Sequence, residues 1–373
     1  MRELIDGSTA IVRGALDAGC DFFAGYPITP ASPILMAMMR ELPRRGGVAI
    51  QGEDEIASIG FCIGAAMGGA RAMTATSGPG ISLYSENLGL AIMGEVPLVV
   101  VDVQRLGPAT GGATTVGQGD VQFVRWGTSG GFPVIALAPS SIAECYALTR
   151  RAFELAARFR APVFLLSDKE LNLTTNTLEV GEAGGELLPP QPRAADAAVV
   201  AGFRPYRYEP ADDVPPLVPI GGENLVRFTG STHDERAFLT KDAPTVARLN
   251  EHLAAKIDRH RDVIEDVALD LEPGATTLLV AYGVTAGAQR SAVRELRRRG
   301  ERVSSAVVRS LWPVPETALA RAMEGVERIV VAELNQGQYR RELERLAGGR
   351  EVVGVTRLDG KLIASLAIVE AAA

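Results

Sequence analysis

Residues 48–80 read VAIQGEDEIASIGFCIGAAMGGARAMTATSGPG, and they carry the clearest indication of the fold. Two short apolar runs, Val48–Gln51 and Ala72–Ser77, have the length and the bounding residues of buried strands. The segment between them, Glu53–Gly69, is long enough for a helix and rich in small apolar residues. A strand, a helix and a second strand in this order predict a parallel pair joined by a crossover helix.

The same alternation continues on both sides of this stretch. Helices are expected over Ile34–Leu42, Ser82–Gly94 and Ser140–Phe159. The other strands are expected over Phe22–Gly25, Pro97–Val103, Phe132–Ala138 and Pro162–Asp168. Because alternating strands and helices are typical of a doubly wound sheet, we predict an α/β fold with a parallel-sheet domain over residues 1–180.

The chain changes character after residue 180. Residues 181–265 are predicted to form an extended excursion or linker, because they are rich in proline, glycine and aspartate and have one charged helical stretch near Ala243–Val267. A second, smaller α/β domain is expected over residues 266–373. Its expected strands are Thr276–Ala281, Val303–Arg309, Arg328–Glu333 and Glu351–Thr356, and its expected helices are Ala286–Arg299, Pro315–Glu324 and Tyr339–Leu346.

Composition excludes several classes of protein. The formal net charge of -7 argues against nucleic acid as a partner, because phosphate binding needs a basic surface. The uncharged stretch Ile56–Ala70 is too short to cross a membrane, and the N-terminus lacks the apolar core of a signal peptide. Three distant cysteines without a C-x-x-C pair predict neither a disulfide framework nor a metal cluster. We therefore expect a cytoplasmic protein without a membrane partner.

Polar residues follow four of the predicted strands. In an open parallel sheet, ligands collect beyond the carboxyl ends of the strands. The segments at that edge are Tyr26–Pro30, Gln51–Glu55, Ser77–Gly80 and Gln104–Gly111. Together they bring carboxylates, hydroxyls, a helix N-terminus and one arginine to a single edge, which favours a ligand site there.

Each segment also has a purely structural interpretation. The acidic run Glu53–Glu55 is typical of a helix N-terminus, and Ser77–Gly80 is typical of a helix-entry turn. Arg105 could be a surface residue, and the two prolines of Tyr26–Pro30 could simply stiffen a loop. Their common position at one sheet edge, rather than any one segment, favours the functional interpretation.

The order and spacing of these motifs resemble the α subunit of the 2-oxoacid:ferredoxin oxidoreductases, in the 2-oxoglutarate branch and without a fused γ domain ahead of it. The resemblance covers nearly the whole chain. Its motifs are Tyr26–Pro30, Glu53–Gly60, Thr76–Gly80, Gln104–Gly111, Thr232–Arg236, Leu311–Pro315 and Val331–Gln338. It implies a pyrimidine-type thiamine-diphosphate-binding domain followed by a smaller domain similar to the transketolase C-terminal domain.

The resemblance also assigns roles to residues. Glu55 matches the glutamate that contacts N1′ of the thiamine pyrimidine and promotes its acid–base chemistry, and Gly78 and Gly80 match the turn beside the cofactor. Arg105, Thr29 and Thr114 match residues that bind the 2-oxoacid. The residues around Thr114, GGATTVGQGD at 111–120, depart from the 2-oxoglutarate branch, which leaves pyruvate, branched-chain and aromatic 2-oxoacids open as substrates.

The family's reaction is the oxidative decarboxylation of a 2-oxoacid to acyl-CoA and CO₂, with coenzyme A as co-substrate and ferredoxin as electron acceptor. The sequence lacks the Gly-Asp-Gly…Asn pattern of a diphosphate and Mg²⁺ site. We therefore expect a β subunit to bind the diphosphate, Mg²⁺ and a [4Fe-4S] cluster, with γ and ferredoxin-like δ subunits as further partners. No metal is expected on this chain.

Other functions stay open at this point. A dinucleotide-binding enzyme is disfavoured because Gly78–Leu83 lacks the third glycine of the fingerprint. A non-oxidative thiamine-diphosphate decarboxylase or transketolase-like subunit and a non-catalytic assembly subunit are further alternatives. His233 begins a His-Asp-Glu run that resembles a set of metal ligands, but metal binding is disfavoured because adjacent loop residues rarely converge on one ion. His252 and His260 are expected to face solvent. Gly60, Gly64 and Gly68 share one helix face and could admit either a neighbouring helix or a partner subunit.

Overall fold

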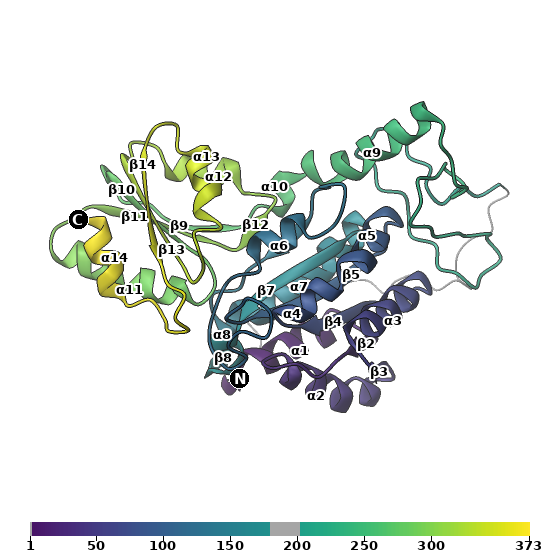
Figure 1. The fold of residues 1–373 in the computed structure, drawn as a ribbon, viewed down its shortest axis with the longest axis horizontal. Helices are drawn as coiled ribbons and strands as arrows, with labels where there is room; N and C mark the ends of the chain where they lie inside the picture. Colours follow the sequence, from purple (N-terminus) through teal and green to yellow (C-terminus); the bar gives the residue numbers. More distant parts are fainter. Residues whose placement is uncertain (1, 180–201) are drawn as a thin grey trace.

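A computed structural model describes residues 2–179 and 202–373 of the chain. Figure 1 shows two α/β bodies side by side, the first in purple to blue and the second in light green to yellow. The predicted α/β class is confirmed. The proline- and glycine-rich part of the expected excursion, residues 181–201, lies outside the described residues. No helix within the described ranges is long and apolar enough to cross a membrane.

The first body is built on a seven-stranded sheet with the order β12-β6-β7-β5-β4-β2-β3. Every neighbouring pair is parallel except β12 and β6, which are antiparallel. Strand β5 lies in the interior of the sheet, and all seven of its residues are buried. The strands are β2 (Phe22–Gly25), β3 (Val48–Gln51), β4 (Ala72–Thr76), β5 (Leu98–Gln104), β6 (Ile135–Leu137), β7 (Pro162–Asp168) and β12 (Ser310–Trp312).

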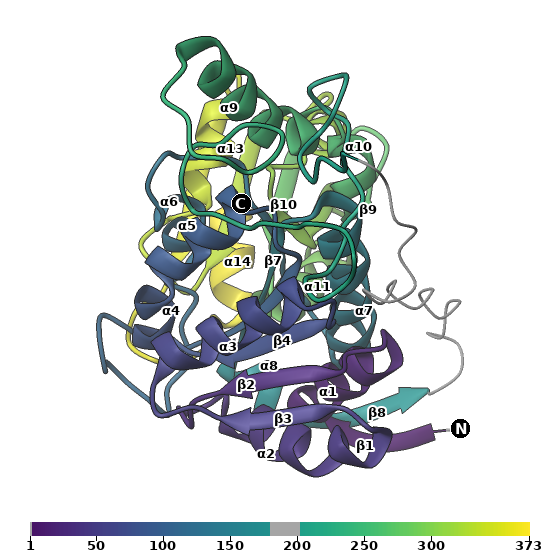
Figure 2. The same ribbon diagram turned by 90° about the vertical axis from the view of Figure 1, so that its right-hand side faces the viewer.

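Helices cover both faces of this sheet. Figure 2 shows α3 to α5 on one side of the strands and α1 and α2 on the other. The helices are α1 (Gly7–Asp17), α2 (Ser32–Glu41), α3 (Glu55–Met67), α4 (Pro79–Leu83), α5 (Ser85–Met93), α6 (Val121–Trp126), α7 (Ile142–Phe159) and α8 (Lys169–Leu173), with a short 3-10 turn at Pro43–Arg45. A separate antiparallel pair joins β1 (Arg2–Asp6) to β8 (Thr175–Glu179).

The second body contains a five-stranded sheet with the order β14-β13-β10-β11-β9. Strand β9 is antiparallel to β11, and the other pairs are parallel. Its strands are β9 (Val267–Asp270), β10 (Thr277–Ala281), β11 (Val303–Val308), β13 (Arg328–Glu333) and β14 (Glu351–Thr356). Its helices are α11 (Thr285–Arg298), α12 (Glu316–Ala322), α13 (Arg340–Leu346) and α14 (Ser365–Ala372).

The two bodies share one apolar core. A single cluster of buried residues runs from helices α3 and α5 of the first body to Leu319 and Leu343 of the second. Strand β12 leaves the second body and pairs with β6 at the edge of the first sheet. Trp312 is the last residue of β12, and its indole N–H donates to the Val121 carbonyl at 3.0 Å. The second body is therefore fixed against the first by both packing and strand pairing.

Most of the expected strands have their predicted bounds or differ by one residue. The largest differences are at Ser82–Gly94, where two helices, α4 and α5, replace one, and at Phe132–Ala138, which shortens to β6. Helix α4 begins at Pro79, directly after Gly78, whose φ of 45° lies in the left-handed region that favours glycine. The elements that were not predicted are helices α1, α6, α8 and α14 and strands β1, β8, β9 and β12.

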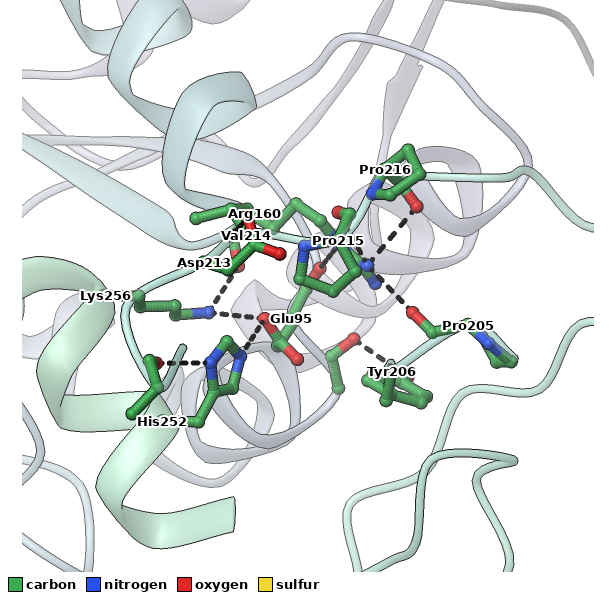
Figure 3. A network of polar contacts seen from close by, with 12 residues as sticks. Glu95, Arg160, Pro205, Tyr206, Asp213, Val214, Pro215, Pro216, His252 and Lys256 are labelled. Carbon is green, nitrogen blue, oxygen red and sulfur yellow. Dashed lines mark hydrogen bonds and ion pairs between the residues drawn. The ribbon is translucent and has the colours of Figure 1, made fainter. Parts of the chain in front are cut away.

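A buried polar network holds residues 202–242 and helix α9 (Ala243–Asp258) against the first body (Figure 3). The short helix α10 (Arg261–Ile264) follows α9. The Glu95 carboxylate accepts from Lys256 Nζ at 2.9 Å and from His252 Nε2 at 3.0 Å, and all three side chains are buried. The prediction that His252 faces solvent is therefore wrong. Its ring is buried in this network and also stacks on Tyr208. His260 is one-third exposed and lies 3.5 Å from an Asp212 carboxylate oxygen.

Arg160 binds the extended part of the same region. Its guanidinium donates to the carbonyl oxygens of Pro205 and Pro215 at 3.2 and 3.1 Å, and to that of Glu95 at 3.2 Å (Figure 3). Prolines lack an N–H but keep a carbonyl acceptor, so a planar group with several donors suits a proline-rich segment. These contacts attach the described part of the excursion to the end of α7.

Candidate active site

The four predicted segments meet at the carboxyl edge of the first sheet. Glu55 is the first residue of α3, which begins there because the Asp54 side chain caps it by accepting from the Ala57 N–H at 2.7 Å. The structural interpretation therefore holds for Asp54, whereas Glu53 is exposed before the helix. Glu55 itself is only 7% exposed, so its carboxyl lies inside the fold rather than on the helix surface.

The turn Ser77–Gly80 packs against both predicted charged residues. A β-carbon on Gly80 would lie 2.8 Å from Glu55 Oε1 and 2.1 Å from Thr76 Oγ1. A β-carbon on Gly78 would lie 3.3 Å from Arg105 Cγ. The two glycines thus let one turn approach Glu55 on one side and Arg105 on the other.

Arg105 is buried and only partly hydrogen-bonded. Arg105 is the residue after β5 and is 5% exposed. Its Nη1 donates to the Thr29 backbone oxygen. Its Nε is buried and has no hydrogen-bond partner among the described residues. Burial lowers the pKa of the guanidinium, and the nearby carboxyls of Asp120, Asp102 and Glu55 oppose that shift. An arginine held in this way has donors left for an anionic ligand.

Thr29 contacts Arg105 through its backbone. Its backbone oxygen, not its hydroxyl, contacts Arg105, and the residue is exposed at the sheet edge. Thr114 is also exposed, on the loop between β5 and α6. The structure therefore brings Glu55, Gly78, Gly80 and Arg105 together, with Thr29 beside Arg105 and Thr114 farther out on a loop.

Two acidic residues of the site were missed from the sequence. Asp102 lies within the apolar strand β5, and Asp120 precedes α6; both belong to the surroundings of Arg105. Asp102 is fully buried, and burial followed by the charge of Asp120 raises its pKa well above the ordinary value. Burial raises the pKa of Asp120 to about 6. A carboxyl in the middle of LVVVDVQ was the available signal, since buried strands rarely carry a charge.

A cavity of about 740 Å³ opens beside Arg105, between the two bodies. Gly78, Arg105 and Asp120 line one wall, and the loop after β13 lines the other with Asn335 and Gln338. A polar core fixes that loop: Asn335 Nδ2 donates to the Gln118 carbonyl at 2.7 Å, and the Leu334 N–H donates to Gln118 Oε1 at 3.1 Å. The second body therefore completes the cavity rather than lying apart from it.

The loop that carries Asn335 is itself held by a buried carboxylate. Glu333, at the end of β13, accepts from the Tyr282 hydroxyl at 3.0 Å and from the Tyr339 N–H at 2.9 Å. It also accepts from the Arg340 N–H at 2.9 Å, and so binds the first turn of α13. This motif, part of Val331–Gln338, thus has a clear structural role in shaping one wall of the cavity.

His233 lies in the region that precedes α9. It is buried, its Nδ1 lies 2.9 Å from the Ser231 carbonyl, and its ring packs on Tyr206. Burial lowers its pKa, which favours the neutral ring. Among the described residues, no group of three or more histidine, cysteine or acidic side chains is arranged to hold a metal ion.

Comparisons with known proteins agree on one family. Residues 13–249 match the family model described as pyruvate flavodoxin/ferredoxin oxidoreductase, thiamine diP-bdg. Residues 275–368 match the model of the pyruvate:ferredoxin oxidoreductase core domain II. The chain is 40% identical to the 2-oxoglutarate synthase subunit KorA of Methanothermobacter thermautotrophicus, over 96% of this chain and 94% of that protein. It is 35% identical to the ketoisovalerate oxidoreductase subunit VorB of the same organism, over 97% and 94%.

A solved structure is similar over the full length of the chain. It is the 2-oxoglutarate:ferredoxin oxidoreductase from Magnetococcus marinus with 2-oxoglutarate, coenzyme A and succinyl-CoA bound. The TM-score is 0.89 at 29% identity, and the match covers 99% of this chain. This chain spans 64% of that solved chain, which is less than two thirds of its length.

Proposed function

Because the chain belongs to the 2-oxoacid:ferredoxin oxidoreductase family as an α-type subunit, we propose that it supplies half of the active site of a 2-oxoglutarate:ferredoxin oxidoreductase. The reaction is the oxidative decarboxylation of 2-oxoglutarate to succinyl-CoA and CO₂, with electrons passed to ferredoxin. The choice of acid rests on the higher identity to a 2-oxoglutarate synthase subunit, 40%, than to a ketoisovalerate enzyme subunit, 35%. The observation that carries the proposal is that one turn, Ser77–Gly80, touches both Glu55 and Arg105.

The residues present fit the pyrimidine end of thiamine diphosphate. Glu55 offers a buried carboxyl, as a group that shares a proton with a ring nitrogen requires. Ser77 Oγ is fully buried and has no hydrogen-bond partner among the described residues, so it is free to bind a ligand. Gly80 keeps the space in front of the Glu55 carboxyl free of a side chain. Glu55, Ser77 and the glycine turn would therefore hold the cofactor ring.

Each residue then has a task in the reaction. When bound, thiamine diphosphate supplies a carbon nucleophile and accepts the electron pair released with CO₂. Glu55 holds and moves a proton at the pyrimidine ring. Arg105 binds the 2-oxoacid carboxylate, for which its planar fork of donors is suited, and the Thr29 carbonyl fixes one end of that fork. The 740 Å³ cavity admits the acid from the side of the second body.

An open face of α3 favours a partner subunit next to this site. Nothing lies within 4 Å of the β-carbon positions of Gly60 and Gly64, so no other part of the described chain packs on them. Ile56 and Phe61 are 50% and 46% exposed on the same helix. We propose that a β subunit covers this face and binds the diphosphate, Mg²⁺ and a [4Fe-4S] cluster. Further γ and ferredoxin-like δ subunits would complete the enzyme.

The proposal is tested by reconstitution. The purified chain alone should bind thiamine diphosphate weakly and show no activity. Mixed with its β partner, it should support reduction of a viologen or ferredoxin that depends on 2-oxoglutarate, coenzyme A and thiamine diphosphate. Pyruvate, 2-oxoisovalerate and an aryl pyruvate serve as competing substrates. Full activity of the single chain, or CO₂ release without acceptor reduction, would refute the proposal.

A further inference from the structure

We propose that Asp102 and Asp120 form a proton-sharing carboxyl pair that positions Arg105 and so controls how tightly the 2-oxoacid carboxylate is held. The inference rests on the proposed function, in which Arg105 binds that carboxylate. It assigns two positioning residues that neither the motifs nor the predicted site included.

The pair is built by the fold rather than by proximity in sequence. Asp102 lies in β5, three residues before Arg105, and is fully buried. Asp120 is brought back to the same strand because its backbone N–H donates to Gln104 Oε1 at 3.2 Å. Gln104 is fixed in turn by its Nε2, which donates to the Ser167 carbonyl at 3.3 Å. The carboxyls of Asp102 and Asp120 then lie close enough for each to act on the other.

A hydrogen bond between these two carboxyls would require a proton on one of them. Three carboxyl oxygens of the pair are buried and have no hydrogen-bond donor in good geometry among the described residues: Asp102 Oδ1, Asp102 Oδ2 and Asp120 Oδ2. The Gly78 N–H faces Asp102 without reaching that geometry. Two ionised carboxylates in contact would repel each other in the protein interior, so one shared proton is the stable arrangement near neutral pH. Burial, which raises the pKa of both groups, acts in the same direction.

Among the residues that the structure describes, few charged groups act on the pair. Arg105 acts on both carboxyls, and Glu55 on α3 acts on Arg105 from the other side. Asp168 ends β7, the strand next to β5, but its oxygens accept from the Leu171 and Val284 N–H groups at 3.0 and 2.9 Å. Arg105 is therefore the counter-ion of the pair.

The charge on the carboxyl pair then determines whether Arg105 is held by the pair or can bind the substrate carboxylate. With one proton, the pair carries a single negative charge that balances Arg105 and leaves its unpaired Nε available to a ligand. Without that proton, the pair carries two negative charges, binds the guanidinium more strongly and repels the carboxylate of the substrate. The KM for the 2-oxoacid should therefore rise with pH as the pair loses its proton. The turnover step, which depends on Glu55, should not follow this titration.

The experiment measures KM and kcat for 2-oxoglutarate with the assembled enzyme from about pH 5.5 to about pH 8.5, where the acid itself stays ionised. In the unmodified enzyme, KM should rise at the alkaline end by up to about tenfold per pH unit, the limit for one proton. Asp120→Asn and, independently, Asp102→Asn should flatten the KM profile and leave the shape of the kcat profile unchanged. Asp168→Asn is the matched control, because burial raises the pKa of that carboxyl to about 6 as well, yet it does not face Arg105. It should keep the slope of KM.

Three outcomes decide between the ideas. If Arg105→Ala leaves KM unchanged, the substrate-binding part of the proposed function fails. If Arg105→Ala raises KM but Asp120→Asn keeps the pH slope, only the present inference is overturned. A flat KM profile in the unmodified enzyme overturns it too, whether or not the variants fold.

Discussion

The Nη1 of Arg105 donates to the backbone oxygen of Thr29 at 2.5 Å, across 76 residues of sequence. This bond links the carboxyl ends of β5 and β2 and holds the guanidinium at the mouth of the cavity instead of in solvent. It uses one end of the planar fork, so the rest of the guanidinium can contact a ligand. A backbone acceptor, which substitution of the Thr29 side chain would not remove, thus fixes the most important substrate contact that we propose.

Arg105→Ala should lower kcat/KM for the 2-oxoacid by an amount equivalent to roughly 2–5 kcal/mol, as for one partner of a buried charge pair. Arg105→Lys should recover only part of this loss, because an ammonium cannot make the two-pronged contact. Steady-state kinetics with 2-oxoglutarate and with coenzyme A as the varied substrate check the prediction. Normal 2-oxoacid kinetics in the alanine variant would contradict it, and a change confined to coenzyme A would place Arg105 elsewhere.

Glu55→Gln should lower kcat by roughly 10²-fold or more, in line with the loss of an acid–base group. The complex should still assemble, since the substitution keeps the shape of the side chain. Glu53→Gln is the control, because Glu53 is exposed and precedes the helix, and it should change kcat little. Equal and mild effects of the two substitutions would show that the wrong carboxylate was assigned.

Much of this site could be predicted from sequence, because parallel strands place their carboxyl ends along one edge whatever the details of packing. That rule brought Glu55, Arg105 and the glycine turn together. It could not place Thr114, since the loop between β5 and α6 contains glycines and has no periodic pattern to fix it. Asp120 was missed for a related reason: its position depends on a hydrogen bond to Gln104, a contact that no local pattern encodes.

The burial of His252 also could not be predicted from the sequence. His252 lies on a helix rich in charges, which predicts a solvated face. Yet α9 buries His252 and Lys256 against Glu95, a residue that follows α5 with a φ of 50°. A buried pair of opposite charges in distant parts of a sequence gives the same local pattern as two exposed charges. Periodicity alone therefore cannot distinguish them.

Gly80→Ala should destabilise the isolated chain by roughly 1–3 kcal/mol, because its β-carbon would overlap Thr76 Oγ1 and press on Glu55. Gly89→Ala in α5 is the matched control: nothing lies within 4 Å of its β-carbon, and alanine should stabilise that helix by roughly 0.5–1 kcal/mol. Chemical unfolding of both variants measures the difference. A neutral Gly80→Ala would mean that the turn can move away from Glu55.

Gly64→Leu should leave the isolated chain folded, since the β-carbon position is open, but should weaken its assembly with the β subunit. A bulky side chain there would hold the two surfaces apart at the open face of α3. Sedimentation of the mixed subunits measures the affinity. Assembly with unchanged affinity would show that the partner binds another face.

Lys256→Met should destabilise the chain by about 3–5 kcal/mol, because it leaves Glu95 buried without its main counter-charge. Adding Glu95→Gln should recover part of the loss. Burial alone would raise the pKa of Glu95, but Lys256, His252 and Arg160 together hold it well below its ordinary value. Glu95 therefore stabilises the fold above the unfolded-state pKa of about 4.5, and this contribution is lost as pH falls towards its folded pKa.

The pH dependence separates the variants. The unmodified chain should lose unfolding free energy as pH falls below about 4.5, and the double variant should lose less over the same range. Denaturant unfolding at a series of acidic pH values measures both. Parallel curves for the two proteins would mean that the Glu95 network does not govern acid stability.

Strand β12 makes the two halves of the chain interdependent. The segment Ser310–Trp312 belongs to the C-terminal half but borders the N-terminal sheet, where it pairs with β6. A fragment that ended after the first family match would expose β6 as an unpaired edge, a surface prone to aggregation. A protease that cut the connecting region would release neither half, because strand pairing would keep the nicked pieces together.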